Sequence, residues 1–173
     1  MAKRISLREF QVGLVERLTS AARGETSRAL LGVLAGRDYW LLSLADAGEI
    51  VPLPPLTSVP LTQPWFVGIA NIRGMLYSVV DFSGWRGGAS TPCNAQSRLL
   101  LVGARHGINS ALLVRRSLGL RPQQQLHAAP AHLGATETPP WLGGRFTDAQ
   151  GIVWTQLLIP HLLADADYLD IAR

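Results

Sequence analysis

Few side chains in this chain have the types and spacing that metal binding requires. Four histidines are present: His106, His127, His132 and His161. On a helix, His127 and His132 could place two imidazole groups on one face for a zinc ion. Pro130 lies between them, however, and a proline argues against a helix there. The sequence therefore predicts no metal site.

The other reactive side chains also lack suitable partners. Cys93 lies in a loop with no nearby base, so we interpret it as an exposed free thiol rather than a nucleophile. The glycine-rich stretch 84–88 lacks the Lys-Ser/Thr that completes a phosphate-binding loop. Asp81 is the one acid expected to face the interior, so the paired carboxylates of general acid–base catalysis are missing. The sequence thus indicates a protein that is not an enzyme, needs no cofactor and acts through its surface.

Composition favours a folded protein over a disordered or membrane-spanning one. The chain has 173 residues, of which 47% are hydrophobic and 16% charged, against roughly 25% charged in an average soluble domain. No apolar run approaches the roughly 20 residues of a membrane-spanning helix. Charged residues also interrupt the N-terminal segment where a signal peptide would be apolar. We therefore expect a cytoplasmic protein with no direct membrane insertion, unless a partner holds it at a membrane.

Positive charge is concentrated in the middle of the chain. Residues 82–136 contain no acid and six arginines: Arg86, Arg98, Arg105, Arg115, Arg116 and Arg121. A basic stretch can bind nucleic acid, and a β-barrel module that uses these arginines in this way is the alternative function. Only Arg115 and Arg116 are adjacent, however, and no lysine accompanies them. Scattered solvated arginines are thus the favoured interpretation, and an acidic protein surface is as good a partner as a phosphate.

The N-terminal segment is predicted to be an amphipathic helix over residues 6–22, in a separate region 1–24. Ser6 and Glu9 form a capping box, and Gly24 supplies a stop. One apolar stripe follows from helical spacing: Leu7, Phe10, Leu14 and Leu18. This stripe could pack on the chain's own core or dock on a partner.

After residue 24, four pairs of β-prone runs separated by short turns are typical of β-hairpins. The pairs are 29–34 with 39–44, 67–72 with 75–80, 98–104 with 109–115, and 143–147 with 152–156. Many short strands with few helices predict a mainly β fold of small closed barrels. We place two barrel halves at roughly 27–88 and 96–156, inside a domain that covers 25–173.

The segments between the hairpins are predicted to be irregular. Residues 52–64 contain five prolines and are expected to form a connector that cannot join the centre of a sheet. Residues 83–96 are predicted to be a loop, and 121–141 a long, mostly irregular connector. Because Pro160 suits the first turn of a helix, 159–172 is predicted to hold one or two short helices.

The stretch 64–82 combines a proline-led entry with a tight hairpin. Arg73-Gly74 forms the predicted turn, and Asp81 ends the return strand, where it can accept amide hydrogen bonds from a following turn or helix. This stretch resembles the CheW family of chemotaxis coupling proteins. The match is strongest at Gly68, Asn71, Arg73, Gly74 and Asp81. Weaker similarity covers about 27–165. The sequence motif at 64–74 and the extra N-terminal helix resemble those of the branch that serves type IV pili and twitching motility (PilI-type).

The resemblance implies two five-stranded barrels that share a core, in a non-catalytic scaffold. Such proteins bridge the cytoplasmic tips of methyl-accepting chemoreceptors and the regulatory domain of a CheA-like histidine kinase. By matching position, Asn71 and Arg73 would lie at or near the partner-facing surface. Gly68 and Gly74 would shape the backbone there, and Asp81 would brace the hairpin.

The chain departs from the family pattern at several positions. Many relatives have a proline where this chain has Ser78, and leucine where it has Phe82. In the second barrel, Arg115 and Arg116 stand where an acidic residue is common. Such a reversal of charge changes electrostatic complementarity, so we hypothesise that Arg115 or Arg116 contributes to partner choice.

Overall fold

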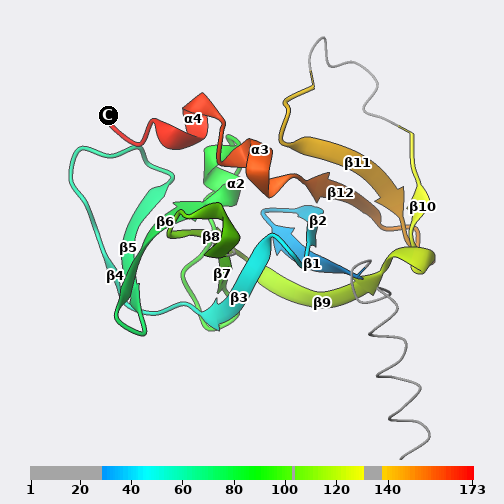
Figure 1. Ribbon diagram of the computed structural model, residues 1–173, viewed down its shortest axis with the longest axis horizontal. Helices are drawn as coiled ribbons and strands as arrows, with labels where there is room; N and C mark the ends of the chain where they lie inside the picture. The colour runs from blue at the N-terminus through cyan, green and yellow to red at the C-terminus, as the bar shows by residue number, and fades with distance from the viewer. Residues whose placement is uncertain (1–28, 103, 131–137) are drawn as a thin grey trace, which may run out of the picture.

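The computed structural model describes residues 29–102, 104–130 and 138–173, which form two β-sheets with short helices along one edge (Figure 1). The predicted N-terminal helix lies outside the described residues. The prediction of a mainly β fold is confirmed, since the described elements are chiefly strands.

The first sheet has the strand order β10-β11-β12-β2-β1-β9. Its strands are β1 (Ala29–Ala35), β2 (Asp38–Ser43), β9 (Arg116–Pro122), β10 (His127–Ala128), β11 (Leu142–Thr147) and β12 (Val153–Leu157). β1 pairs antiparallel with β2 and β9, whereas β12 and β2 run parallel. Segments 29–43 and 116–157 therefore build one sheet together.

The second sheet has the order β3-β7-β8-β6-β5-β4 and is formed by the middle of the chain. Its strands are β3 (Ala47–Pro52), β4 (Leu56–Thr57), β5 (Phe66–Ile72), β6 (Met75–Asp81), β7 (Arg98–Val102) and β8 (Ser110–Val114). β6 and β8 are the parallel pair here, and the other neighbouring strands are antiparallel.

This topology corrects the expected division into halves 27–88 and 96–156. β1 and β2 leave the first half to join β9–β12, while β7 and β8 leave the second half to join β3–β6. The reason is physical: the two parallel pairs connect strands that are remote in sequence, and local turn patterns do not report such pairing. Each sheet also has six strands rather than five, because the two-residue strands β4 and β10 extend the edges.

The connectors predicted as irregular also contain strands. β4 lies within 52–64, but at a sheet edge, where a proline-rich segment is tolerated. β10 lies inside the predicted connector 121–141, and β9 precedes this connector and overlaps its first two residues. β9 was missed because Gly119 and Pro122 are typical of turns. In the structure, Gly119 lies where the β1–β9 register shifts by one residue, so it forms part of a β-bulge.

The core explains why several strands are apolar on both faces. Along β7, Leu100 packs in the cluster shared by both sheets, while its neighbour Leu99 packs in a cluster within the second sheet. β2 shows the same alternation, with Trp40 in the shared cluster and Leu41 in a cluster within the first sheet. Since side chains alternate along a strand, each sheet has its own interior and also contributes to the common core.

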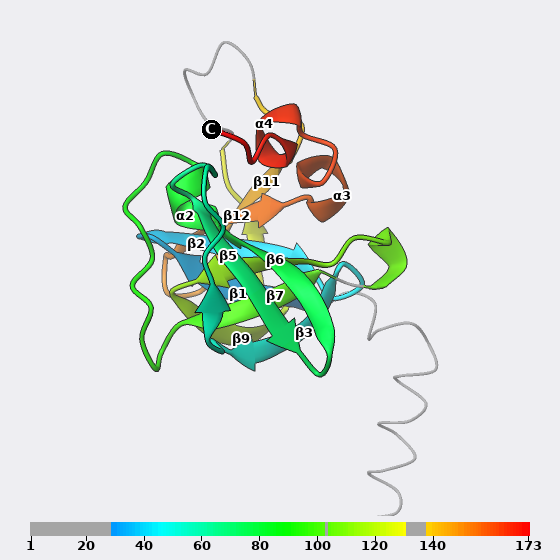
Figure 2. The same cartoon turned by 90° about the vertical axis from the view of Figure 1, so that its left-hand side faces the viewer.

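Three short helices lie along one edge of the molecule: α2 (Phe82–Trp85), α3 (Ile159–Leu162) and α4 (Ala166–Leu169) (Figures 1 and 2). Asp165 caps α4 by accepting hydrogen bonds from the amides of Asp167 and Tyr168. The buried Tyr168 hydroxyl lies 2.7 Å from Ser110 Oγ at the start of β8. Burial raises the pKa of Tyr168 to about 12, so this phenol stays neutral and remains a hydrogen-bonding group.

Candidate functional site

The turn between β5 and β6 projects Arg73 from a two-residue loop. Arg73 has φ 52° and Gly74 φ 84°, the left-handed conformations that a type I′ hairpin turn needs at both central positions. Asn71 Oδ1 accepts a hydrogen bond of 2.9 Å from the Gly74 amide. Asn71 therefore stabilises the turn from within its own strand, and Gly74 is favoured there by its φ angle.

Arg73 forms a two-pronged ion pair with Glu49 of β3. Arg73 Nη1 lies 2.8 Å from Glu49 Oε2, and Arg73 Nη2 lies 2.6 Å from Glu49 Oε1. The side chains remain 76% and 45% exposed, so the pair orients the guanidinium without burying it. A surface pair of this kind contributes only about 0–1 kcal/mol to stability, which favours a role in presenting Arg73.

Two exposed apolar side chains follow Arg73 and Gly74 in the chain. Met75 and Leu76 at the start of β6 are 51% and 60% exposed. They lie on opposite faces of the strand, since successive side chains alternate, so both faces of the hairpin tip are open to solvent. We call Glu49, Asn71, Arg73, Met75 and Leu76 the hairpin surface. Exposed apolar residues beside an oriented arginine are typical of protein interfaces.

Gly68 lies deeper in the same hairpin and contacts β4 rather than solvent. It is buried, has φ 137°, and a Cβ atom there would stand 2.3 Å from the carbonyl oxygen of Thr57. The register of β5 against β6 also shifts at this point. Gly68 therefore allows β4 to approach β5 closely, and it is not part of the exposed surface.

Asp81 holds the segment after β6 rather than the hairpin tip. Its Oδ1 accepts hydrogen bonds from the Ser83 amide (3.2 Å) and the Thr91 hydroxyl (2.6 Å), and its Oδ2 accepts one from the Thr91 amide (2.7 Å). Only its backbone amide serves the hairpin, by donating to the Trp65 carbonyl at the base. The carboxylate is 4% exposed, so it acts as an internal brace for residues 83–91.

Arg115 and Arg116 lie at the other end of the second sheet. β6 and β8 run parallel, and Arg73 precedes β6 whereas Arg115 follows β8. A seven-residue strand spans roughly 20 Å, so the two predicted sets of partner residues are not brought together. Arg116 donates a 3.2 Å hydrogen bond to Gln96 Oε1, while Arg115 lines a cavity against the β1–β2 turn.

The six arginines of 82–136 do not act as one group. Five have a partner within the chain: Arg86 with Asp38, Arg98 with backbone carbonyls, Arg105 with Asp46, Arg116 with Gln96 and Arg121 with the Leu118 carbonyl and the Trp154 ring. An arginine with an internal partner is less available to neutralise a phosphate. This arrangement does not favour the nucleic-acid-binding alternative.

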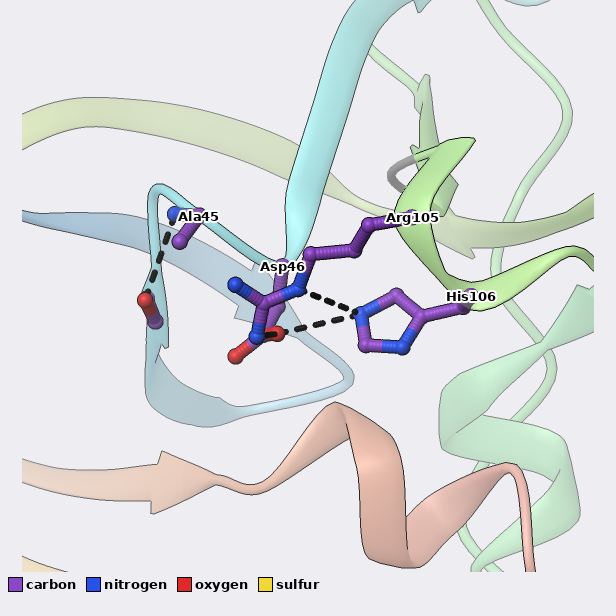
Figure 3. A network of polar contacts seen from close by, with 5 residues as sticks. Ala45, Asp46, Arg105 and His106 are labelled. Atoms are coloured by element: carbon purple, nitrogen blue, oxygen red, sulfur yellow. Dashed lines mark hydrogen bonds and ion pairs between the residues drawn. The ribbon is translucent and has the colours of Figure 1, made fainter.

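A further polar network fixes the start of β3, which carries Glu49. The buried Asp46 carboxylate accepts hydrogen bonds from Arg105 Nη2 and from His106 Nε2, the latter at 3.0 Å (Figure 3). Since His106 Nε2 donates to this carboxylate, it cannot also accept from Arg105 Nε, which lies 3.4 Å away. The network joins the β2–β3 turn to the β7–β8 connection and thereby positions Glu49.

Sequence reasoning missed Glu49 as the partner of Arg73, although a signal was present. Glu49 and Arg73 are the only charged residues between Asp46 and Asp81. Two opposite charges in an otherwise uncharged stretch are reasonable candidates for a pair. The Asp46 network had no comparable signal, because its members come from turns that are distant in sequence.

Other functional classes find no support in the described part of the chain. No group of three or more metal-ligating side chains occurs among the described residues, and Cys93 is exposed. None of the described helices is long and apolar enough to span a membrane.

A family model described as CheW-like domain matches residues 29–167, and the chain belongs to that family. CheW-like scaffold domains are non-catalytic. The predicted family and fold are thus confirmed.

Individual relatives agree with this assignment. The chain is similar to Protein PilI of Pseudomonas aeruginosa (strain PAO1), with 28% identity over 149 residues that cover 82% of this chain and 79% of that protein. Among solved structures, it is similar to the scaffolding protein TtCheW from Thermoanaerobacter tengcongensis, with a TM-score of 0.66 and 18% identity over 84% of this chain and 97% of that one. The latter likeness supports the fold.

Proposed function

We propose that this chain is a cytoplasmic adaptor that couples methyl-accepting chemoreceptors to a CheA-like histidine kinase in a type IV pilus chemosensory system that controls twitching motility. Its membership of the CheW-like family supports an adaptor role, and its likeness to Protein PilI supports the pilus system. In this proposal, the kinase regulatory domain and the receptor tip are the partners, and the chain itself performs no chemistry.

The hairpin surface is the proposed contact with these partners. The observation that carries this proposal is the paired and exposed Arg73, which projects from the hairpin turn that precedes the exposed Met75 and Leu76. A partner that covers Met75 and Leu76 would exclude water from the Arg73–Glu49 pair. Ion pairs and hydrogen bonds strengthen when water is excluded, so an arginine at the centre of the contact can be worth about 2 kcal/mol or more.

A binding titration tests this proposal. The full chain is titrated with the regulatory domain of the chemotaxis-type kinase and, separately, with a receptor cytoplasmic tip. Arg73→Asn is the first variant, because asparagine tolerates the left-handed conformation of the turn. We expect Arg73→Asn to weaken binding about thirtyfold, which corresponds to about 2 kcal/mol. Arg173→Asn, at an exposed arginine away from the hairpin, is the matched control and should bind as the wild type does.

The outcomes separate the parts of the proposal. Binding that Arg73→Asn leaves unchanged would reject the hairpin surface but keep the adaptor function. Absence of binding to both partners would reject the adaptor function in this form. A Leu76→Ser variant provides a second readout, because Leu76 is 60% exposed and its loss does not disturb the core.

We also propose that Arg115 or Arg116 contributes to partner choice. Both are exposed, and they replace an acid that is common in relatives. Reversal of both charges to glutamate should change relative affinity for a panel of kinase regulatory domains and receptor tips, because rim charges set complementarity. Unchanged binding to every partner would contradict this proposal.

A further inference from the structure

A cavity lies where the two sheets meet, at the end of the molecule remote from the hairpin surface. Its volume is about 610 Å³, and its lining comes from three separate segments. These are the β1–β2 turn (36–38), α2 with the segment that follows it (83 and 86–92), and Arg115 in the crossover from β8 to β9. Small-molecule sites commonly have volumes of about 300–1,000 Å³ and often lie at such junctions.

The lining of this cavity has an excess of positive charge. Arg37, Arg86 and Arg115 supply three positive charges, and Asp38 supplies one negative charge, which leaves a net charge of +2. Asp38 Oδ2 is committed to Arg86 Nη1 at 2.9 Å. Within the described residues, no hydrogen bond or ion pair engages the side chain of Arg37 or Arg115. Arg37 and Arg115, from different segments, therefore line one cavity without a charge partner among the described residues.

The wall that carries Arg86 is firmly held. The Arg86 guanidinium lies 4.3 Å from the centre of the Trp40 ring, which is buried. Below it, Asp81 binds both the amide and the hydroxyl of Thr91, and Ser83 Oγ donates to the Ala89 carbonyl at 2.7 Å. A wall fixed in this way loses little conformational entropy when a ligand binds.

Glycines bring the β1–β2 turn against this wall. A Cβ atom at Gly36 would lie 2.6 Å from Ser83 Oγ, and one at Gly88 would lie 2.9 Å from the same atom. The turn that carries Arg37 and the segment after α2 therefore meet at close range through Ser83. The backbone next to Arg37 is thus packed against the segment that carries Arg86.

We propose that this cavity binds an organic phosphate, with the phosphoryl group held by Arg37 and Arg115. A phosphate monoester carries a charge of about −1.5 to −2 at neutral pH, which matches the net charge of the lining. Guanidinium groups bind phosphoryl oxygens in pairs of parallel hydrogen bonds. A single carboxylate would leave one positive charge unmatched, and the cavity is large enough to hold an organic group beside the phosphate.

Isothermal titration calorimetry of the full chain at low ionic strength tests this proposal. The ligands are ADP and pyrophosphate, with citrate as a polycarboxylate comparison. The matched variants are Arg115→Gln and Arg116→Gln, because these neighbours are both exposed but only Arg115 lines the cavity. Neither substitution removes a core contact, and thermal melts establish that both variants fold.

We expect saturable, mutually competitive binding of ADP and pyrophosphate. Arg115→Gln should weaken both about tenfold, as loss of one charge-assisted hydrogen bond does, while Arg116→Gln should change either by less than about twofold. The proposal is overturned if neither phosphate binds up to about 10 mM, or if the two variants lose affinity equally. Pyrophosphate binding without ADP binding would reject an organic phosphate. Citrate binding as tight as that of ADP would instead indicate a site for carboxylates of an acidic protein.

Discussion

The hairpin end and the cavity end of the second sheet use arginine in contrasting ways. At the hairpin, Arg73 is paired with Glu49 and is followed in the chain by the exposed Met75 and Leu76. At the cavity, Arg37 and Arg115 carry charge that the described residues do not compensate, and their surroundings are glycine, serine and threonine. A paired arginine has a fixed direction but a weak long-range field. An uncompensated one attracts anions over about 10 Å at 0.1 M salt.

Because of this difference, experiments can distinguish binding at the hairpin surface from binding at the cavity. Contacts at the hairpin should depend on shape and apolar burial, and they should persist in moderate salt. Binding at the cavity should fall steeply as salt is added, because screening acts on exposed charge. The following predictions test how independent the two ends are, from the largest expected effect to the smallest.

The largest effect is expected within the hairpin, from Gly68→Ala compared with Gly74→Ala. A Cβ at Gly68 would meet the Thr57 backbone at 2.3 Å, whereas one at Gly74 would meet nothing within 4 Å. We expect Gly68→Ala to lower the free energy of unfolding by about 3 kcal/mol or more, and Gly74→Ala by about 1 kcal/mol, the cost of a left-handed alanine. Urea denaturation measures both. Equal losses would show that β4 is free to move away.

At the cavity end, Asp81→Ala should be strongly destabilising, while Asp38→Ala should not. Asp81 is 4% exposed and accepts three hydrogen bonds from Ser83 and Thr91. Its removal leaves buried donors without partners and should cost about 3 kcal/mol. The Asp38 side chain is 58% exposed in its pair with Arg86, so its removal should cost less than about 1 kcal/mol. Denaturation curves of both variants measure these losses in the free energy of unfolding. A loss below about 1 kcal/mol for Asp81→Ala would reject the role of Asp81 as a brace.

Acid should weaken the contribution of Asp148 to the stability of the β11–β12 turn. Burial alone would raise the pKa of Asp148, but hydrogen bonds from Trp154 Nε1 and the Ile152 and Gln150 amides, with the nearby Arg121 charge, lower the pKa overall. A lowered pKa in the folded state means that this carboxylate stabilises the fold above its unfolded pKa of about 3.9. That stability is lost as the pH falls through the folded pKa.

Asp148→Asn provides the measurement. The variant should be less stable than the wild type at pH 7, and the difference should shrink as the pH is lowered below about 4. The hydrogen bond from the Gly74 amide to Asn71 Oδ1 involves no carboxylate, so Asn71→Ser should show a difference in stability that does not change with pH. A constant difference for Asp148→Asn would mean that its charge is not responsible.

The smallest effect is expected from the ion pair that marks the hairpin surface. Glu49→Gln should lower the free energy of unfolding by less than about 1 kcal/mol, since both side chains of the pair are substantially exposed. Thermal melts at low and high salt measure this change. A larger loss would mean that the ion pair holds the hairpin against β3. The pair would then be a structural contact, as Asp81 is at the cavity end.

Local signals predicted much of this fold from the sequence. The four hairpins were found because their turns and alternating strands are encoded within about 15 residues. The exposed turn at Arg73 and the amide-capping position of Asp81 followed from the same kind of pattern. The short helices after Pro160 did as well.

Pairing between remote segments could not be predicted in this way. No short turn connects the strands of the parallel pairs β2–β12 and β6–β8. The boundaries expected for the two barrel halves were therefore wrong. β9 was missed because its residues favour turns when taken alone, and pairing with β1 overrides that preference. The cavity was missed for a related reason, because Arg37, Arg86 and Arg115 converge only after the two sheets have packed together.

The parallel pairing of β12 with β2 also has a consequence for biosynthesis. β2 leaves the ribosome early, whereas β12 is among the last strands to emerge, and domains begin to fold from the N-terminal end during synthesis. Until β12 arrives, the outer edge of β2 has no strand to pair with in this sheet. Open strand edges are sites of unwanted association. The nascent chain is therefore most vulnerable to aggregation between the synthesis of Ser43 and that of Leu157, a window in which chaperone protection would matter most.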